Sequence, residues 1–454
     1  MRKFAAIALL GIVMLDCGRE PNVKLGASPK NEYIVFLKSS FIKPMALREP
    51  FLSMDKASEE KMRREVRDSI EQFMTSYALS PATAMVYTDV VSGFAILMED
   101  TLANVIRSSE KVLSVMEDVE IEGRPIQQGR PIQQNEKING DADNPDDTDY
   151  QEWGLKDKGD RFVSWAVSSA GGAENGSDKT SVIWIVDTGI STAKEGYLKI
   201  RTDLAINAIK GEKPNEYNDD NGHGTMVASV AGAKAIGWKI GDTSKNIIAG
   251  VSRGAGVVPV KVLDRNGSGK WKNVINGLNH IVLSKRTGDV INLSLGQLLP
   301  PGKQCIDKDF YGLKEMIETL AVKLNHSVVI AAGNDGRMVA KSLPACLSFS
   351  AEARKSIFVI AAATHDKQCA LFSNYGDGVD FVAVGEDVFC VYLPNSMGKW
   401  QFMVASGTSL SAAVVSGIIH SSGMPPEARK KKVKCKPADT EQSDRQVHKY
   451  AFRH

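Results

Sequence analysis

Residues 406–417 read Ser406-Gly407-Thr408-Ser409-Leu410-Ser411-Ala412-Ala413-Val414-Val415-Ser416-Gly417. Glycine and small hydroxyl residues pass directly into small apolar residues, which is the pattern of a tight turn that opens a buried helix. The first four N–H groups of a helix have no partner inside it, and they lie at the positive end of its dipole. A serine such as Ser409 at this point suits an attacking oxygen and the oxyanion that it creates. The same pattern also fits an ordinary N-cap of a core helix.

The composition is that of a globular protein with room for two or three domains, since 43% of the 454 residues are hydrophobic. A net charge of +2 argues against a nucleic-acid partner held by a broad positive field. Six cysteines are too few for a disulfide scaffold.

Residues 1–17 have the pattern of an export signal, because Arg2 and Lys3 precede an uncharged apolar run from Phe4 to Leu15. This run is too short to span a bilayer, which needs about 20 residues. The following Met14-Leu15-Asp16-Cys17 resembles a bacterial lipobox, although the Asp departs from the small residue usual before the cysteine. We expect an exported protein, extracellular or in the cell envelope, with Cys17 as a candidate site of lipidation and membrane attachment.

Two segments follow the signal. Residues 31–122 alternate strand and helix patterns, which predicts a small α+β domain: strands at 32–38, 90–98 and 112–121, and helices at 58–77 and 100–108. Residues 123–150 hold a direct repeat, Gly-Arg-Pro-Ile-Gln-Gln, at 123–128 and 129–134, and then Asn, Asp and Pro. We expect these residues to be an exposed linker in which proteolytic processing occurs.

Residues 151–422 form the larger predicted domain. Its apolar runs are continuous and alternate with helical stretches, which indicates a mostly parallel sheet covered on both faces, as in α/β proteins. The runs are 181–186, 256–263, 290–295, 327–332 and 357–363. Ligands bind such sheets at the carboxyl ends of the strands.

Three motifs stand at strand ends or helix starts. Asp187-Thr188-Gly189 ends one buried strand, and its carboxylate could bind a metal or a ribose. No phosphate-binding glycine motif accompanies it, which disfavours a nucleotide. Gly222-His223-Gly224-Thr225 precedes a run of small apolar residues, and Ala332-Gly333-Asn334 ends another buried strand. Taken singly, this His and this Asn would be structural.

Taken in order with Gly407-Thr408-Ser409-Leu410-Ser411, these motifs resemble those of the subtilisin-like serine peptidases. The resemblance implies a three-layer α/β fold with a mostly parallel central sheet, preceded by an inhibitory propeptide at 31–122. It implies that Asp187, His223 and Ser409 are the catalytic triad, with Asn334 in the oxyanion hole. Three segments are implied to contact the substrate: Gly267-Ser268-Gly269, Ser294-Leu295-Gly296 and Ala331-Ala332-Gly333.

The resemblance also implies partners and a maturation step. The partners are a protein or peptide substrate, with an uncharged P1 residue expected, and the chain's own propeptide as intramolecular inhibitor. Autocleavage is expected between residues 122 and 149. Catalysis needs no metal or other cofactor, but relatives often bind structural calcium, for which the loop at 241–246 is a weak candidate.

The chain departs from the family pattern in places. Ala413 stands where proline is usual in the nucleophile helix, Met226 where a histidine is common, and Ser191 where Asp or Asn is usual. Since alanine favours helix, we expect the helix to persist. Two other hypotheses stay open: a catalytically silent homologue that binds peptides or partners, and a structural surface lipoprotein.

The end of the chain, 423–454, carries a basic run from Arg429 to Lys436 and then polar residues. This pattern predicts a solvated or disordered tail, or alternatively attraction to anionic lipid or the cell surface. The five cysteines after residue 300 allow at most two disulfides: Cys305, Cys346, Cys369, Cys390 and Cys435.

Overall fold

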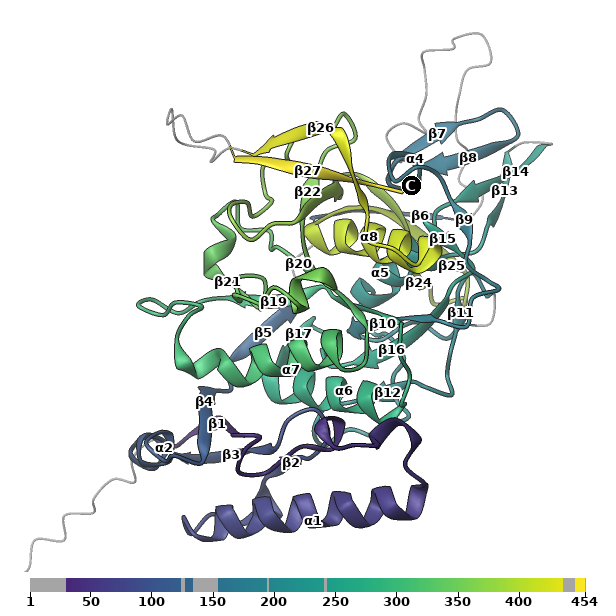
Figure 1. The fold of residues 1–454 in the computed structure, drawn as a ribbon. Coiled ribbons are helices and arrows are strands. Elements are labelled where there is room, and N and C mark those ends of the chain that lie inside the picture. Colours follow the sequence, from purple (N-terminus) through teal and green to yellow (C-terminus); the bar gives the residue numbers. More distant parts are fainter. Residues whose placement is uncertain are drawn as a thin grey trace, which may run out of the picture.

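The computed structural model describes residues 30–123, 127–133, 154–193, 196–240, 243–435 and 446–453. The predicted signal with Cys17 lies outside the described residues, as does most of the expected linker. The described chain forms an N-terminal α+β domain and a larger α/β domain (Figure 1).

The N-terminal domain is a four-stranded antiparallel sheet in the order β2-β3-β1-β4, covered by helices. The Asp55 side chain caps the long helix, and Val66, Ile70 and Phe73 form its buried stripe at the predicted helical spacing. The elements are β1 (Lys30–Leu37), α1 (Lys56–Thr75), β2 (Met85–Tyr87), β3 (Gly93–Glu99), α2 (Asp100–Arg107) and β4 (Val112–Glu117).

The central sheet of the larger domain has the order β11-β16-β10-β18-β20-β22-β23-β27-β26, and β12 also pairs with β16. Every pairing in it is parallel except that of β27 with β26. The predicted α/β fold with a mostly parallel sheet is confirmed. The strands are β10 (Val182–Asp187), β11 (Lys199–Ile200), β12 (Ile206–Asn207), β16 (Gly256–Lys261), β18 (Val290–Leu293), β20 (Ser327–Ala331), β22 (Ile357–Ala363), β23 (Phe381–Val384), β26 (Glu427–Cys435) and β27 (Gln446–Phe452).

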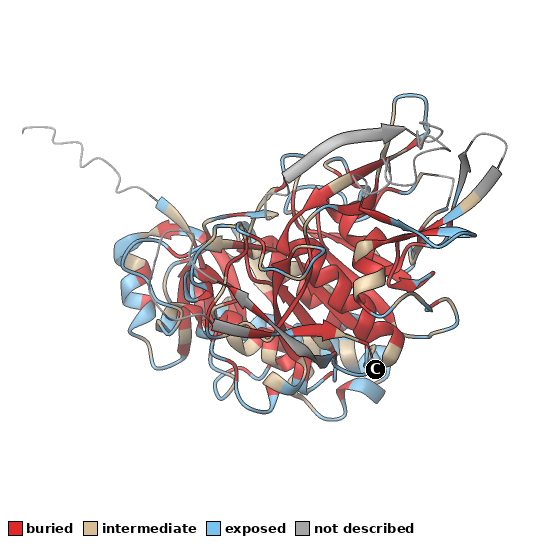
Figure 2. Cartoon of the chain, turned by 90° about the horizontal axis from the view of Figure 1, so that it is seen from above, coloured by how far each residue is buried: buried red, intermediate tan, exposed pale blue. Residues whose placement is uncertain are grey.

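Helices cover both faces of this sheet. α5 (His223–Gly232) is buried along its whole length, as is α8 (Thr408–Ser422) except for its last residue. These helices of small and apolar residues therefore lie inside the domain. Figure 2 shows that the buried residues gather in the interior of the molecule. α6 (Trp271–Leu283) and α7 (Tyr311–Val322) lie between the sheet and the N-terminal domain (Figure 1).

Smaller sheets surround this core. Two of them matter for the site: β17-β5-β19-β21, and β24-β25-β6. Their strands are β5 (Glu120–Gly123), β17 (Ser268–Lys270), β19 (Leu295–Leu298), β21 (Ser342–Leu343), β6 (Gln127–Gln133), β24 (Val388–Pro394) and β25 (Trp400–Ser406). The strands of the remaining small sheets are β7 (Leu155–Asp157), β8 (Arg161–Ser164), β9 (Glu174–Asn175), β13 (Ile236–Ile240), β14 (Thr243–Ile248) and β15 (Ser252–Arg253). The short helix α4 (Trp165–Ser169) follows β8.

The prediction of a solvated tail at 423–454 is wrong for its described residues. β26 and β27 form a hairpin that extends the central sheet, and Val433, Cys435 and Tyr450 are each 1% exposed. The basic run also contains a strand pattern, because Lys432-Val433-Lys434-Cys435 alternates charged with apolar residues. The larger domain therefore continues past Ser422 to at least Arg453, whose guanidinium donates to the Val251 carbonyl.

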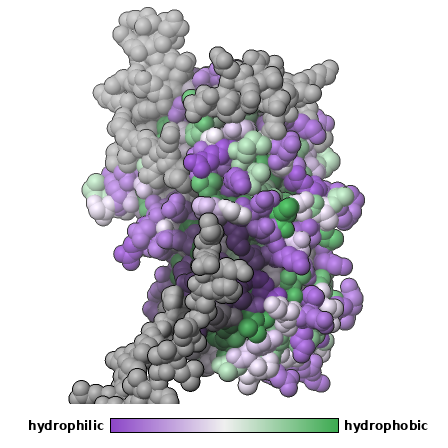
Figure 3. All heavy atoms as spheres, turned by 90° about the vertical axis from the view of Figure 1, so that its left-hand side faces the viewer, coloured by the Kyte–Doolittle hydropathy of each residue, from purple (hydrophilic) through white to green (hydrophobic). Residues whose placement is uncertain are grey.

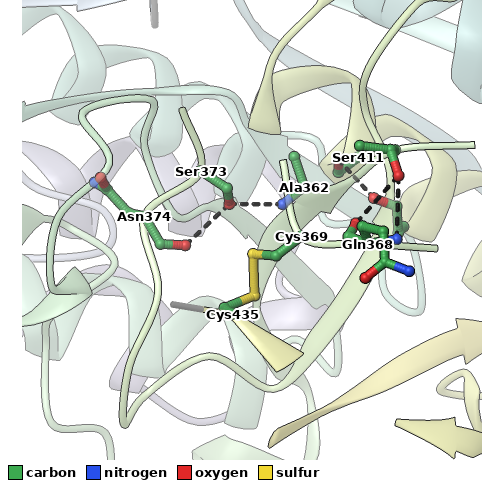
Figure 4. Close-up of a disulfide and its surroundings, with 9 residues drawn as sticks. Ala362, Gln368, Cys369, Ser373, Asn374, Ser411 and Cys435 are labelled. Carbon is green, nitrogen blue, oxygen red and sulfur yellow. Dashed lines mark hydrogen bonds between the residues drawn. A yellow bond between two sulfur atoms is a disulfide. The ribbon is translucent and has the colours of Figure 1, made fainter. Parts of the chain in front are cut away.

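Two disulfides join distant segments, Cys305 to Cys346 and Cys369 to Cys435, and Cys390 is a buried free thiol. Burial raises the pKa of this thiol. The second disulfide ties the C-terminal hairpin to the loop between β22 and β23, next to Ser373 (Figure 4).

The expected linker is also ordered in part. Gln127–Gln133 forms β6, which pairs antiparallel with β25, so this segment is not simply an exposed connection. Its polar composition did not predict a strand because edge pairing uses main-chain groups and needs little apolar surface. Pro131 is compatible with β6 because this strand is at the edge of its sheet.

The N-terminal domain packs against α6 and α7. At α7, Gly312 makes room for Phe36, since a Cβ on this glycine would lie 2.0 Å from the Phe36 ring. At α6, the Lys272 ammonium lies 2.5 Å from Glu32, and the Asn279 side chain accepts from the Val90 N–H.

One face of the molecule is mainly polar where its residues are described. The side that lies at the left of Figure 1 shows mostly hydrophilic residues, with scattered hydrophobic ones among them (Figure 3). Among the helices that the structure describes, none is both long and apolar enough to cross a bilayer.

Candidate active site

Asp187, His223 and Ser409 meet at the carboxyl edge of the central sheet. Nδ1 of His223 lies 2.7 Å from Oδ1 of Asp187, and Nε2 of His223 lies 3.2 Å from Oγ of Ser409. All three residues are buried, at 5% exposure or less. A carboxylate can therefore orient an imidazole whose other nitrogen faces a hydroxyl, which is the arrangement that activates a serine oxygen.

Local structure explains why these side chains converge. Asp187 is the last residue of β10, while His223 begins α5 and Ser409 is the second residue of α8. Gly222 precedes His223 with φ of 106°, a conformation that favours glycine, and a Cβ there would lie 2.1 Å from the Tyr392 ring. The expected helix after Ser409 persists through Ala413, since α8 is unbroken from Thr408 to Ser422.

The Asn334 side chain is oriented by the residue before Ser409. Its Oδ1 accepts from the Thr408 N–H and from the Thr408 hydroxyl, each at 2.8 Å. The Gly333 N–H in turn donates to Oγ1 of Thr408. With its oxygen fixed in this way, the Asn334 amide directs its nitrogen, a donor, away from Thr408.

A buried carboxylate that sequence reasoning missed organises the loop before His223. Asp219 is 2% exposed and accepts five hydrogen bonds, from the N–H groups of Asn221, Gly222 and Thr225 and from two hydroxyls. One hydroxyl belongs to Thr188, beside Asp187. Asp219 therefore joins the end of β10 to the start of α5, and only its place within a polar, glycine-bounded loop hinted at this role.

Two further supporting residues were not predicted. The Lys261 ammonium is buried and donates to the carbonyls of Thr188 and Leu263 and to Asp220. Asn374 is fully buried, and its Oδ1 accepts from the N–H groups of Asp335 and Arg337. Asn374 thus holds the turn that carries Asn334.

Two of the three segments expected to contact substrate contact β5 of the chain itself. Gly267 accepts a hydrogen bond from the Gly123 N–H, Ser268 and Gly269 pair with Glu122 and Ile121, and Leu295 and Gly296 pair with Gly123 and Glu122. The carbonyl of Ser294 accepts from the Ser409 hydroxyl at 3.4 Å. Ala331 and Ala332 are fully buried at the end of β20, next to Gly333.

β5 ends beside the candidate catalytic histidine. A Cβ placed on Gly123 would lie 3.5 Å from Nδ1 of His223 and 3.1 Å from the Leu263 side chain. The last residue of β5 therefore lies beside the imidazole.

The described residues do not form the calcium site that was expected near residues 241–246. Gly241 and Asp242 lie outside the described residues, and Thr243–Ile248 forms β14, paired with β13. Within the described ranges, no three carboxylate, imidazole or thiol side chains gather as a metal site would require.

Comparisons with known proteins agree on a family. The Peptidase_S8 model, described as the subtilase family, matches residues 178–421. The cell wall-associated protease of Bacillus subtilis is 28% identical over 332 residues, which are 69% of this chain and 31% of that protein. The major intracellular serine protease of the same organism is 32% identical over 254 residues, 53% of this chain and 67% of the relative.

Coverage of these relatives is uneven, and the chain spans less than a third of the cell wall-associated protease. Among solved structures, a cold adapted subtilisin-like serine proteinase aligns with 62% of this chain and 91% of its own, at a TM-score of 0.44 and 21% identity.

Proposed function

This chain belongs to the subtilase family of serine peptidases, and we propose that it is an exported endopeptidase made as a zymogen. The observation that carries the proposal is the pair of contacts from His223, 2.7 Å to Asp187 and 3.2 Å to Ser409. The substrate is a protein or peptide, and no cofactor takes part in the chemistry.

The reaction proceeds through an acyl-enzyme. His223 accepts the Ser409 proton as Oγ bonds to the substrate carbonyl carbon, and it then gives that proton to the leaving amine as the C–N bond breaks. Asp187 holds the imidazole in one tautomer and stabilises its cation. Water attacks the acyl group by the reverse sequence of proton transfers and releases the acid.

Charge that develops on the carbonyl oxygen needs donors. The Asn334 amide nitrogen and the Ser409 N–H at the start of α8 supply them. The contacts that fix Oδ1 of Asn334 on Thr408 support this role, because they hold the donor in place before the reaction.

The N-terminal domain acts as the inhibitor. β5 lies antiparallel between β17 and β19, on the segments that the family resemblance assigns to substrate. Maturation separates this domain by cleavage between Gly123, which lies beside His223, and Gln127, which lies opposite Ser406. This interval of the chain is narrower than the 122–149 expected from sequence.

The test is labelling by a fluorophosphonate probe, together with the appearance of a processed band on a gel. Both are expected in the wild-type chain and are lost in Ser409→Ala. Ser411→Ala is the matched control, because that buried hydroxyl in the same helix donates only to the Ala383 carbonyl and should leave labelling intact.

Two outcomes favour the rival hypotheses. A chain that is processed but never labelled is a catalytically silent homologue cut by another peptidase, and a chain that is neither labelled nor processed is a structural surface lipoprotein. Sequencing the N-terminus of the exported product also tests the maturation interval and whether Cys17 is retained.

A further inference from the structure

A hollow of about 710 Å³ opens beside the C-terminal end of the larger domain, and none of its described lining residues belongs to the candidate active site. The β7–β8 hairpin, the turn after α4, β15 and the end of β27 contribute its walls (Figure 1). A volume of this size is ordinary for a small-molecule site. Three of the lining residues are cations, Lys158, Arg161 and Arg253, and none of those that the structure describes is an acid.

These three cations are accessible and only weakly engaged. All of them are exposed, and within the described ranges neither Lys158 nor Arg253 has an ion-pair partner. The Arg161 guanidinium lies 3.3 Å from the Asp160 carboxylate, but both side chains are more than half exposed, so water and salt weaken this pair. A negatively charged ligand can therefore contact all three.

A fourth cation lies buried behind the wall of the hollow. Arg453 is 4% exposed, and a Cβ on the lining residue Gly171 would lie 3.4 Å from the Cβ of Arg453. The Arg453 guanidinium donates to the Val251 carbonyl and lies 3.6 Å from the half-exposed Glu174 carboxylate. Its Nε has no hydrogen-bond partner in the described part of the chain. A buried guanidinium with so few acceptors carries positive charge that its surroundings do not fully compensate.

The carboxylates of the neighbouring elements do not cancel this charge. On the β7–β8 hairpin, Asp157 is paired at 3.0 Å with the Lys245 ammonium, a cation that is not among the lining residues. The other acid of this hairpin is Asp160, and the acid of β9 is Glu174. These two carboxylates stand against the four cations, so the hollow keeps a net positive charge.

We propose that this hollow is a binding site for an anion that carries several phosphate groups. Guanidinium groups match the oxygens of phosphate through paired N–H donors, and cations on separate elements suit a ligand with more than one charged group. Val163, Ile248 and Phe452 also line the hollow, so the organic part of a phosphate ester finds apolar surface there. A soluble polyphosphate and a phospholipid headgroup share this chemistry. The inference does not depend on the proposed peptidase function.

The experiment measures two kinds of binding to the full chain. Calorimetry follows the binding of inorganic tripolyphosphate, and sedimentation follows binding to phosphatidylcholine vesicles with and without phosphatidylglycerol. Arg253→Gln should weaken tripolyphosphate binding about tenfold, because one charge-assisted contact is lost. Lys323→Gln is the matched control, since this exposed lysine at the end of α7 lies outside the hollow and should leave binding unchanged. Both replaced residues are exposed, so both variants should fold, which thermal unfolding checks.

Sedimentation with the phosphatidylglycerol vesicles that is lost in Arg253→Gln identifies a lipid headgroup as the ligand, and tripolyphosphate binding without it identifies a soluble phosphate. The proposal is overturned if neither probe binds, or if Arg253→Gln and Lys323→Gln weaken binding equally. It is also overturned if tripolyphosphate binds only after the five aspartates between residues 141 and 149 are changed to Asn. That result would assign the hollow to the chain's own acidic segment.

Discussion

Two buried aspartates sit in regions of different character. Asp219, in the loop before His223, accepts five hydrogen bonds that engage both of its oxygens. Asp118, where the N-terminal domain meets α6, accepts one from the Lys272 N–H, and its Oδ2 finds no hydrogen-bond partner in the described chain. The Lys272 ammonium stays 3.8 Å from that oxygen.

The difference in hydrogen bonding indicates how firmly each region is held together. A buried carboxylate with all its acceptors used makes a rigid frame, whereas one that is poorly paired makes burial costly. Burial accordingly raises the pKa of Asp118 to about 6, despite the nearby Lys272. The aspartate that frames the candidate active site is therefore fully paired, and the one at the contact with the N-terminal domain is not. This contact is the one that the proposed maturation has to separate.

The largest expected effect is on catalysis and comes from a change at Asn334. Asn334→Ala should lower kcat by roughly 10²–10³ with little change in KM, because one oxyanion donor is lost. The fold should persist with some loss of stability, because Thr408 loses the acceptor of two hydrogen bonds. Steady-state kinetics on the processed enzyme measure this effect, and an unchanged kcat would show that Asn334 is not a donor to the oxyanion.

A second change attacks the frame itself. Asp219→Asn replaces one accepting oxygen by an NH₂ group facing N–H donors, which should lower the free energy of unfolding by about 2–4 kcal/mol. Denaturant unfolding measures this loss. Glu216→Gln is the control, because Glu216 is exposed in the same loop and its one ion pair is with the exposed Lys213. If both variants lose stability equally, Asp219 does not have the role that its hydrogen bonds suggest.

The smallest expected effect concerns pH. Burial raises the pKa of Asp118 from 3.8 to about 6. A carboxyl released to water returns toward its ordinary pKa, so docking takes up a proton between these values, is favoured at low pH and weakens as pH rises through 6. Glu32 has the opposite effect at lower pH. Burial raises its pKa, but Lys272 and Lys270 together lower that pKa by more, so the net pKa is below the ordinary value. The ion pairs of Glu32 therefore favour docking until the solution is acid enough to protonate this carboxylate.

Asp118→Asn should therefore flatten the pH dependence of docking between pH 4 and 6. Hydrogen exchange of β1 and β4 amides in the Ser409→Ala chain, corrected for the intrinsic effect of pH, measures docking. Glu117→Gln, at an exposed neighbouring position, should keep the wild-type slope. A slope that survives in the Asp118 variant would place the titrating group elsewhere.

The parts of the fold and site that sequence predicted are those encoded locally. The strand that ends at Asp187 is a continuous apolar run. His223 directly follows Gly222 and Ser409 is two residues after Gly407, each at the start of a helix. Small, flexible residues at such boundaries mark where side chains can converge above a parallel sheet.

What escaped prediction depends on distant partners. Nothing in the polar loop that holds Asp219 and Asp220 tells which carboxylate turns inward, because their contacts with Thr188 and Lys261 come from distant parts of the chain. The C-terminal hairpin was hidden for the same reason: its burial comes from pairing with β23, not from its charged composition. β6 depends on main-chain pairing, which composition does not reveal.

The bond between Cys369 and Cys435 closes a ring of chain that contains Ser409. Closing a loop of 66 residues lowers the entropy of the unfolded chain, which raises its free energy by roughly 4 kcal/mol in the loop-entropy treatment. A thiol reductant would open this ring without touching the imidazole or the hydroxyl, so reduced enzyme should keep its turnover when cool and lose it sooner on heating. Its working lifetime is thereby tied to the oxidant supply of its surroundings.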